Sequence, residues 1–147
     1  RRQVLHFNVT DHPTAAWTLQ QLRRVVGDAE HHKYLIHDRD AIFAKHLDDS
    51  IRVLGLEVLR SPFASPKANA ICERVIGTIR RECLDHMIVF GEAHLRRILG
   101  AYAAYYNGSR THRSLNKDAP IPRDVQGVGG IFAKPHLGGL HHQYVRI

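Results

Sequence analysis

Residues 33–38 read KYLIHD, a short apolar run followed closely by an acidic residue. Three consecutive apolar residues are too few for a helix, so the run predicts a short, buried strand of a parallel sheet. Asp38 then falls just past the carboxyl end of that strand, the edge at which open α/β sheets bind ligands. Asp40 lies two residues further on and could serve equally well. The stretch therefore predicts an α/β protein with a carboxylate at its sheet edge.

Strands and helices are expected to alternate on both sides of this stretch. The predicted strands are Gln3–Val9, Lys33–His37, Leu56–Leu59 and a short closing strand within Leu140–Ile147. The predicted helices run from Pro13 to Gly27, from Leu47 to Leu54, from Asn69 to about Met87 and from Glu92 to Tyr106. Thr10 or Asp11 is expected to cap the first helix and Asn69 the third. This order is typical of the α/β class.

The composition is that of one globular domain with an excess of positive charge. The chain has 147 residues, and its 21 Lys and Arg against 14 Asp and Glu give a net charge of +7. This balance predicts a polyanionic partner, most often nucleic acid, with a merely basic surface as the alternative. No apolar run is long enough to span a membrane, so no membrane partner is expected. Cys72 and Cys83 are too few for a disulfide scaffold and are expected in the core.

A second carboxylate, Glu73, lies 35 positions after Asp38, in the first turns of the third predicted helix. If that helix packs across the sheet edge, the two carboxylates approach each other and supply the oxygen ligands that Mg²⁺ and two-metal phosphoryl chemistry require. Arg80 follows Glu73 by seven positions on the same helix face, where it suits a neighbouring phosphate. The alternative is a solvated helix face and a turn or capping role for Asp38.

Three segments together resemble the integrase core of retroviral-integrase-like (DDE) insertion-sequence transposases. Residues 37–43, HDRDAIF, resemble the segment that carries the family's second Asp. Residues 65–74, SPKANAICER, resemble the helix start that carries its Glu, and 34 residues separate Asp38 from Glu73. Residues 105–107, YYN, with the nearby RTH at 110–112 and Leu115, resemble the family's closing signature.

This resemblance implies a fold, a chemistry and a set of partners. The implied fold is ribonuclease-H-like, with a partial integrase catalytic core over residues 1–115 and a loop-rich tail over residues 116–147. The implied activity is DNA integration or transposition by metal-dependent strand transfer, in which a 3′ hydroxyl attacks DNA. Asp38 and Glu73 would be catalytic and hold Mg²⁺ or Mn²⁺, and Arg80 would orient a phosphate. The implied partners are transposon ends, target DNA and further copies of the chain, in the bacterial cytoplasm at the nucleoid.

Basic side chains around the implied active site are the candidates for DNA contact. They belong to the third predicted helix and to the irregular segment after the fourth: Arg74, Arg80, Arg81, Arg110, His112 and Arg113. Side chains of this kind contact phosphate oxygens and position a duplex without reading its sequence. The alternative reading of the same charges is a solvated surface.

One feature of the family pattern is missing from the sequence. The family's triad begins with an Asp on the first strand of the fold, and Asp11 is the only carboxylate before Asp38. Asp11 lies too close to Asp38 and at a helix start, where capping explains it better. We therefore expect a truncated copy that lacks the first two strands and is inactive alone. The alternatives are a catalytically inactive DNA-binding remnant or regulator, and a purely structural α/β domain.

Overall fold

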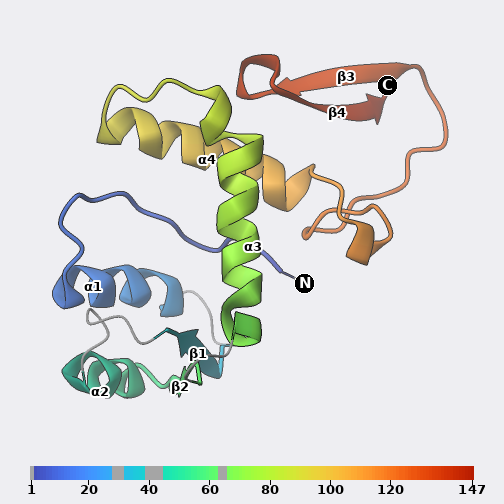
Figure 1. The fold of residues 1–147 in the computed structure, drawn as a ribbon. Coiled ribbons are helices and arrows are strands. Elements are labelled where there is room, and N and C mark those ends of the chain that lie inside the picture. The colour runs from blue at the N-terminus through green and yellow to red at the C-terminus, as the bar shows by residue number, and fades with distance from the viewer. Residues whose placement is uncertain (1, 28–31, 39–44, 63–65) are drawn as a thin grey trace. The chain divides into compact units, whose positions relative to one another are not determined.

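A computed structural model describes residues 2–27, 32–38, 45–62 and 66–147 of the chain. The chain divides into two compact units (Figure 1). The first, here called the parallel-strand unit, comprises Thr10–Thr78. The second, here called the hairpin unit, comprises Arg1–Val9 together with Ile79–Ile147. None of the described helices combines the length and the apolar character needed to cross a membrane.

The parallel-strand unit is built from two parallel strands and the helices around them. Its elements are α1 (Ala15–Val26), β1 (Tyr34–His37), α2 (Lys45–Val53), β2 (Glu57–Arg60) and most of α3 (Pro66–Glu82). The strands pair in parallel from Tyr34 opposite Glu57 to His37 opposite Arg60, as the sequence predicts for a parallel sheet. The core of the unit consists of Leu47, Ile51 and Leu56, with apolar side chains of α1 and both strands packed against them.

β1 is buried on one face only, which corrects the prediction of a fully buried strand. Leu35 packs toward the core and His37 is buried, whereas Tyr34 and Ile36 are about half exposed on the opposite face. Alternate side chains of a strand point to opposite faces, and the core formed with α2 covers only one of them. Within this unit the strand therefore has the one-sided pattern of a half-buried sheet.

Helix starts differ from the predicted caps by a few residues. The cap of α1 is Thr14, whose hydroxyl accepts a hydrogen bond from the main-chain N–H of Trp17, rather than Thr10 or Asp11. α3 begins at Pro66, three residues before the predicted cap Asn69. Proline suits a first helical turn because its φ is already fixed and its missing N–H would have no partner there.

The hairpin unit combines a long helix with an antiparallel strand pair. Its elements are the 3₁₀ turn η1 (Leu84–His86), α4 (Glu92–Gly108), the 3₁₀ turn η2 (Arg113–Leu115), β3 (Ile131–His136), the 3₁₀ turn η3 (Leu137–Gly139) and β4 (His141–Arg146). β3 and β4 pair from Ile131 opposite Arg146 to His136 opposite His141. The sequence predicts loops where β3 lies because Pro135 and several glycines occur there. A proline is tolerated in β3 because each strand of a two-stranded hairpin has a free edge.

The strand predicted over Gln3–Val9 is wrong, because residues 2–10 form no strand. The segment instead runs along α4 and is held by helix side chains. Asn107 accepts from the Val4 N–H (2.9 Å) and donates to the Val4 carbonyl (2.8 Å), as a neighbouring strand would. Arg96 donates to Asn8 Oδ1 and to the carbonyl of Val9, both at 2.8 Å. The alternating pattern thus marks an extended segment whose partner is a helix.

Candidate active site

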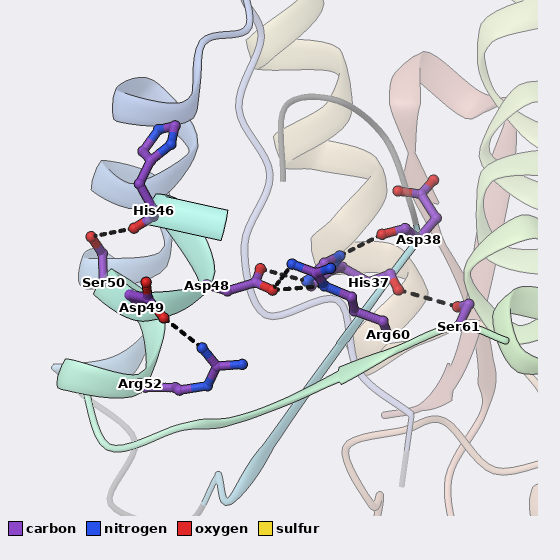
Figure 2. A network of polar contacts seen from close by, with 9 residues as sticks. All are labelled: His37, Asp38, His46, Asp48, Asp49, Ser50, Arg52, Arg60 and Ser61. Atoms are coloured by element: carbon purple, nitrogen blue, oxygen red, sulfur yellow. Dashed lines mark hydrogen bonds and ion pairs between the residues drawn. The ribbon is translucent and has the colours of Figure 1, made fainter. Parts of the chain in front are cut away.

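Asp38 lies where the sequence places it, directly after β1. The strand ends at His37, and Asp38 is exposed. Its carboxylate points away from the imidazole of His37 (Figure 2). Asp40, the alternative acid, lies outside the described residues. This position is the carboxyl end of the parallel strand pair, the edge at which open α/β sheets bind ligands.

The side chain of His37 connects Asp38 to the interior of the parallel-strand unit. Nδ1 donates to the main-chain carbonyl of Asp38 at 2.5 Å, and Nε2 donates to Oδ1 of Asp48 at 3.0 Å (Figure 2). The imidazole therefore bridges the main chain at Asp38 and the carboxylate of Asp48.

Asp48 is a buried carboxylate on α2 that lies between the side chains of His37 and Arg60. Its side chain is 1% exposed. Oδ2 accepts from Arg60 Nε at 2.7 Å and also from Arg60 Nη2, while Oδ1 faces His37. Ser61 follows β2 and donates both its main-chain N–H (2.9 Å) and its hydroxyl (3.2 Å) to the carbonyl of His37. The result is a polar network of α2, β1 and β2 behind Asp38.

The second predicted metal ligand and three of the predicted DNA contacts lie on the surface of α3. Glu73, Arg74, Arg80 and Arg81 are exposed. Arg80 Nε lies 3.6 Å from Asp85 Oδ1, a solvent-exposed pair that contributes little to stability. Asp38 and Glu73 offer the oxygen donors that Mg²⁺ and Mn²⁺ prefer. Within the described residues, no group of three or more His, Cys, Asp and Glu side chains is arranged to hold a metal ion.

Arg110 and His112, predicted to contact DNA, are engaged inside the hairpin unit. Arg110 donates to both carboxylate oxygens of Glu82 (2.7 and 2.5 Å), and Tyr102 donates its hydroxyl to Glu82 at 2.9 Å. His112 Nδ1 lies 3.2 Å from Arg110, and its ring packs edge-on against Tyr106. Arg113, in contrast, is exposed at η2.

The charges of this cluster shift the pKa values of its members. Hydrogen bonds from Arg110 lower the pKa of Glu82, against the opposing effect of burial. Burial, together with the hydrogen bond to Glu82, raises the pKa of Tyr102. Burial and the charge of Arg110 lower the pKa of His112. The carboxylate of Glu82 therefore stays ionised beside Arg110, and the hydroxyl of Tyr102 keeps its proton.

Comparison with known proteins relates part of the chain to a known family. Residues 54–120 match the model of the integrase core domain family. The fold is similar to that of a chain in the cryo-EM structure of a simian T-cell lymphotropic virus intasome in complex with PP2A regulatory subunit B56 gamma, with a TM-score of 0.55 and 12% identity. That similarity covers 92% of this chain and 53% of that chain, so the protein spans about half the length of the intasome chain. No curated protein matches the chain.

The integrase core match confirms the predicted ribonuclease-H-like fold class. The matched segment begins before β2 and contains α3, α4 and η2, and therefore also Glu73 and all six predicted DNA contacts. Asp38 precedes it, in a part of the chain covered by the structural similarity.

Three residues at the two polar networks were not predicted from the sequence: Asp48, Arg60 and Glu82. Asp48 carried a usable signal, because it lies next to Leu47 and three residues before Ile51, on the apolar face of α2. An acid at such a position must find a cationic partner when the helix is buried. Arg60 and Glu82 occur at element ends, where a charged residue is ordinary, so nothing local distinguishes them.

Proposed function

We propose that the chain is part of an integrase-type catalytic core that transfers DNA strands with the help of divalent metal ions. The observation that carries this proposal is the integrase core match over residues 54–120, which includes Glu73 on α3. Asp38, exposed at the carboxyl end of β1, adds a second carboxylate in the same compact unit. Transposon ends and target DNA are the proposed substrates, and further copies of the chain the proposed partners.

The proposed roles follow from the chemistry of the side chains. Asp38 and Glu73 would hold Mg²⁺ or Mn²⁺, which when bound neutralises developing phosphoryl charge and favours attack by a 3′ hydroxyl. Arg80, exposed on α3, would orient a phosphate of the bound DNA. Arg74, Arg81 and Arg113 would supply further phosphate contacts. Arg110 and His112 would act indirectly, by holding the segment that carries Arg113 through the bonds to Glu82 and Tyr106.

Iron-directed cleavage of the chain tests whether Asp38 and Glu73 share a metal ion. Fe²⁺ bound in place of Mg²⁺ generates hydroxyl radicals with ascorbate and peroxide, and these cut the main chain beside the ligands. We expect cuts near both Asp38 and Glu73, suppressed by excess Mg²⁺ and lost in Asp38→Asn. Glu57→Gln, an exposed carboxylate on β2, is the matched control and should leave the cuts unchanged. Cleavage near only one of the two residues would refute a shared site.

DNA binding is tested by fluorescence anisotropy on duplex DNA over a range of salt concentrations. Each phosphate contact contributes a slope of about 0.9 in log affinity against log salt, so the triple variant Arg74→Gln, Arg80→Gln, Arg81→Gln should lose up to about 2.7 of the slope. The matched control replaces Arg23 and Arg24, which are exposed near the end of α1, with glutamine. This variant should lose much less of the salt slope. In a joining assay, Glu73→Gln should abolish product while leaving DNA affinity nearly unchanged. Loss of binding alone would contradict the role given to Glu73.

A second candidate function is DNA binding without chemistry. One observation favours it: Arg74, Arg80 and Arg81 are exposed on α3 and can contact phosphate without a metal ion. This alternative predicts salt-dependent binding to DNA with neither cleavage nor joining in Mg²⁺ or Mn²⁺. It also predicts that Asp38→Asn and Glu73→Gln leave every measured property of the DNA complex unchanged.

A further inference from the structure

The polar network behind Asp38 consists of side chains that are buried in the parallel-strand unit. Asp48 is 1% exposed and the imidazole of His37 is 4% exposed, so both polar side chains have been removed from water. Burying an ion pair costs several kcal/mol per ion, and apolar side chains of similar size at such positions are often more stable. The network therefore stabilises the unit less than an apolar core would. The network lies at the carboxyl end of β1, one residue from Asp38, and this position indicates a role in holding Asp38.

We propose that His37 and Asp48 are positioning residues for the carboxylate of Asp38: Asp48 orients the imidazole, and the imidazole holds the main chain at Asp38. This inference rests on the proposed function, since it concerns the same metal-binding carboxylate.

The geometry fixes the chain on both sides of the peptide that joins residues 37 and 38. The carbonyl of His37 accepts two hydrogen bonds from Ser61, one from the N–H and one from the hydroxyl. The carbonyl of Asp38 accepts from Nδ1 of His37 at 2.5 Å. Asp38 itself is exposed and follows the last strand residue, so the strand ladder alone does not hold it. The imidazole adds a restraint on the main chain at the point where the carboxylate leaves the sheet (Figure 2).

Asp48 determines which way the ring faces. Its Oδ1 accepts from Nε2 at 3.0 Å while its Oδ2 is held by Arg60, so the carboxylate cannot turn without breaking the ion pair. A ring fixed at Nε2 presents Nδ1 to the Asp38 carbonyl. Partners of this kind commonly change metal affinity by 10- to 100-fold without touching the ion.

Two substitutions at His37 separate positioning from stability. An asparagine amide reproduces the donor at Nδ1 but is too short to reach Asp48. A glutamine amide reaches the position of Nε2 and Asp48 but lacks a donor near the Asp38 carbonyl. His37→Asn should therefore keep the restraint on Asp38 at a lower melting temperature, whereas His37→Gln should keep most of the stability and release Asp38. A merely structural role predicts that metal affinity follows stability, with His37→Asn the weaker binder.

The experiment measures Mn²⁺ affinity by electron paramagnetic resonance, the ¹⁵N order parameter of the Asp38 amide and the melting temperature, all on the full chain. We expect His37→Gln and Asp48→Asn to bind Mn²⁺ about tenfold more weakly than the unsubstituted chain, and His37→Asn within about threefold of it. The order parameter at Asp38 should fall in His37→Gln and stay high in His37→Asn. Asp49→Asn is the matched control, because Asp49 is the exposed neighbour of Asp48 and pairs with Arg52.

The order parameter keeps the inference testable apart from the proposed function. If the unsubstituted chain fails to bind Mn²⁺ through Asp38, the proposed function fails, while the order parameters still decide whether His37 restrains Asp38. If Asp38 stays equally rigid in His37→Gln, or if His37→Asn loses more Mn²⁺ affinity than His37→Gln, the positioning role is overturned.

Discussion

Replacing Arg110 with methionine should destabilise the hairpin unit far more than replacing an exposed arginine would. Arg110 makes two short hydrogen bonds to Glu82, and the two side chains are 23% and 32% exposed. Breaking a fully buried pair costs about 3–5 kcal/mol, and a fully exposed pair is worth about 0–1 kcal/mol. The exposure of this pair lies nearer the buried limit, so we expect a loss of about 2–3 kcal/mol. For a unit of this size that is a fall of roughly 10–20 °C in melting temperature.

The chain carries separate optical probes for its two units. Trp17, the single tryptophan, and Tyr34 lie in the parallel-strand unit, while Tyr102, Tyr105, Tyr106 and Tyr144 lie in the hairpin unit. In a Tyr34→Phe background, thermal unfolding followed by tyrosine near-ultraviolet circular dichroism should show the loss, and Trp17 fluorescence should change little.

Three comparisons decide whether the ion pair is the cause. Arg113→Met is the matched control, because Arg113 is exposed, and it should change stability by less than about 0.5 kcal/mol. A double-mutant cycle with Glu82→Gln should give a coupling energy above about 1 kcal/mol. If Arg110→Met costs no more than Arg113→Met, the pair is screened by solvent and the reasoning is refuted.

Three further predictions concern the same unit. Burial and the charge of Arg110 lower the pKa of His112, so the unfolded state takes up the proton first as the pH falls. Stability should therefore decrease as the pH drops below about 6.5. In His112→Asn, the urea midpoint should change less between pH 7 and 5. Gly129 has a φ of +102° and a Cβ there would lie 2.6 Å from the main-chain oxygen of Ile147, so Gly129→Ala should accelerate amide exchange at the base of the hairpin; unchanged exchange would contradict the strain argument. Asn107→Ala removes both bonds to Val4 and should cost about 1–2 kcal/mol, with faster hydrogen exchange of the Val4 amide as the readout.

Helices and the parallel strand pair could be predicted because their signals are local. The apolar residues of α2 recur at helical spacing, and Gly55, with a φ of +86°, follows its end. β3 was missed because Pro135 and the nearby glycines indicate a loop, and the N-terminal segment was assigned wrongly because its hydrogen-bond partners lie far along the chain. Val4 pairs with Asn107, 103 residues away, and no alternation of apolar residues shows whether the partner is a strand or a helix.

The two cysteines predicted for the core show the same limit in the packing. Cys83, directly after α3, is fully buried as predicted, but Cys72 is exposed, as is Ile76 one turn further along the helix. Helical spacing shows that these residues share a face, and it does not show which part of that face is covered. The sequence likewise grouped Arg110 with Arg113 by charge, although one is paired with Glu82 and the other is exposed, because the acid that distinguishes them is 28 residues away.

The proposed metal ligands and most of the proposed DNA contacts fall into different compact units, and this makes the two properties separable. Asp38 and Glu73 belong to the parallel-strand unit, whereas Arg80, Arg81 and Arg113 belong to the hairpin unit. Metal binding depends on a few oxygens at short range, while DNA affinity sums over many phosphate contacts. Arg110→Met, heated to where the tyrosine signal is lost but the Trp17 signal remains, should therefore keep its Mn²⁺ affinity within about threefold and lose most of its DNA affinity. Equal loss of both would mean that the metal ligands depend on the folded hairpin unit and that Asp38 and Glu73 do not form a site within residues 10–78 alone.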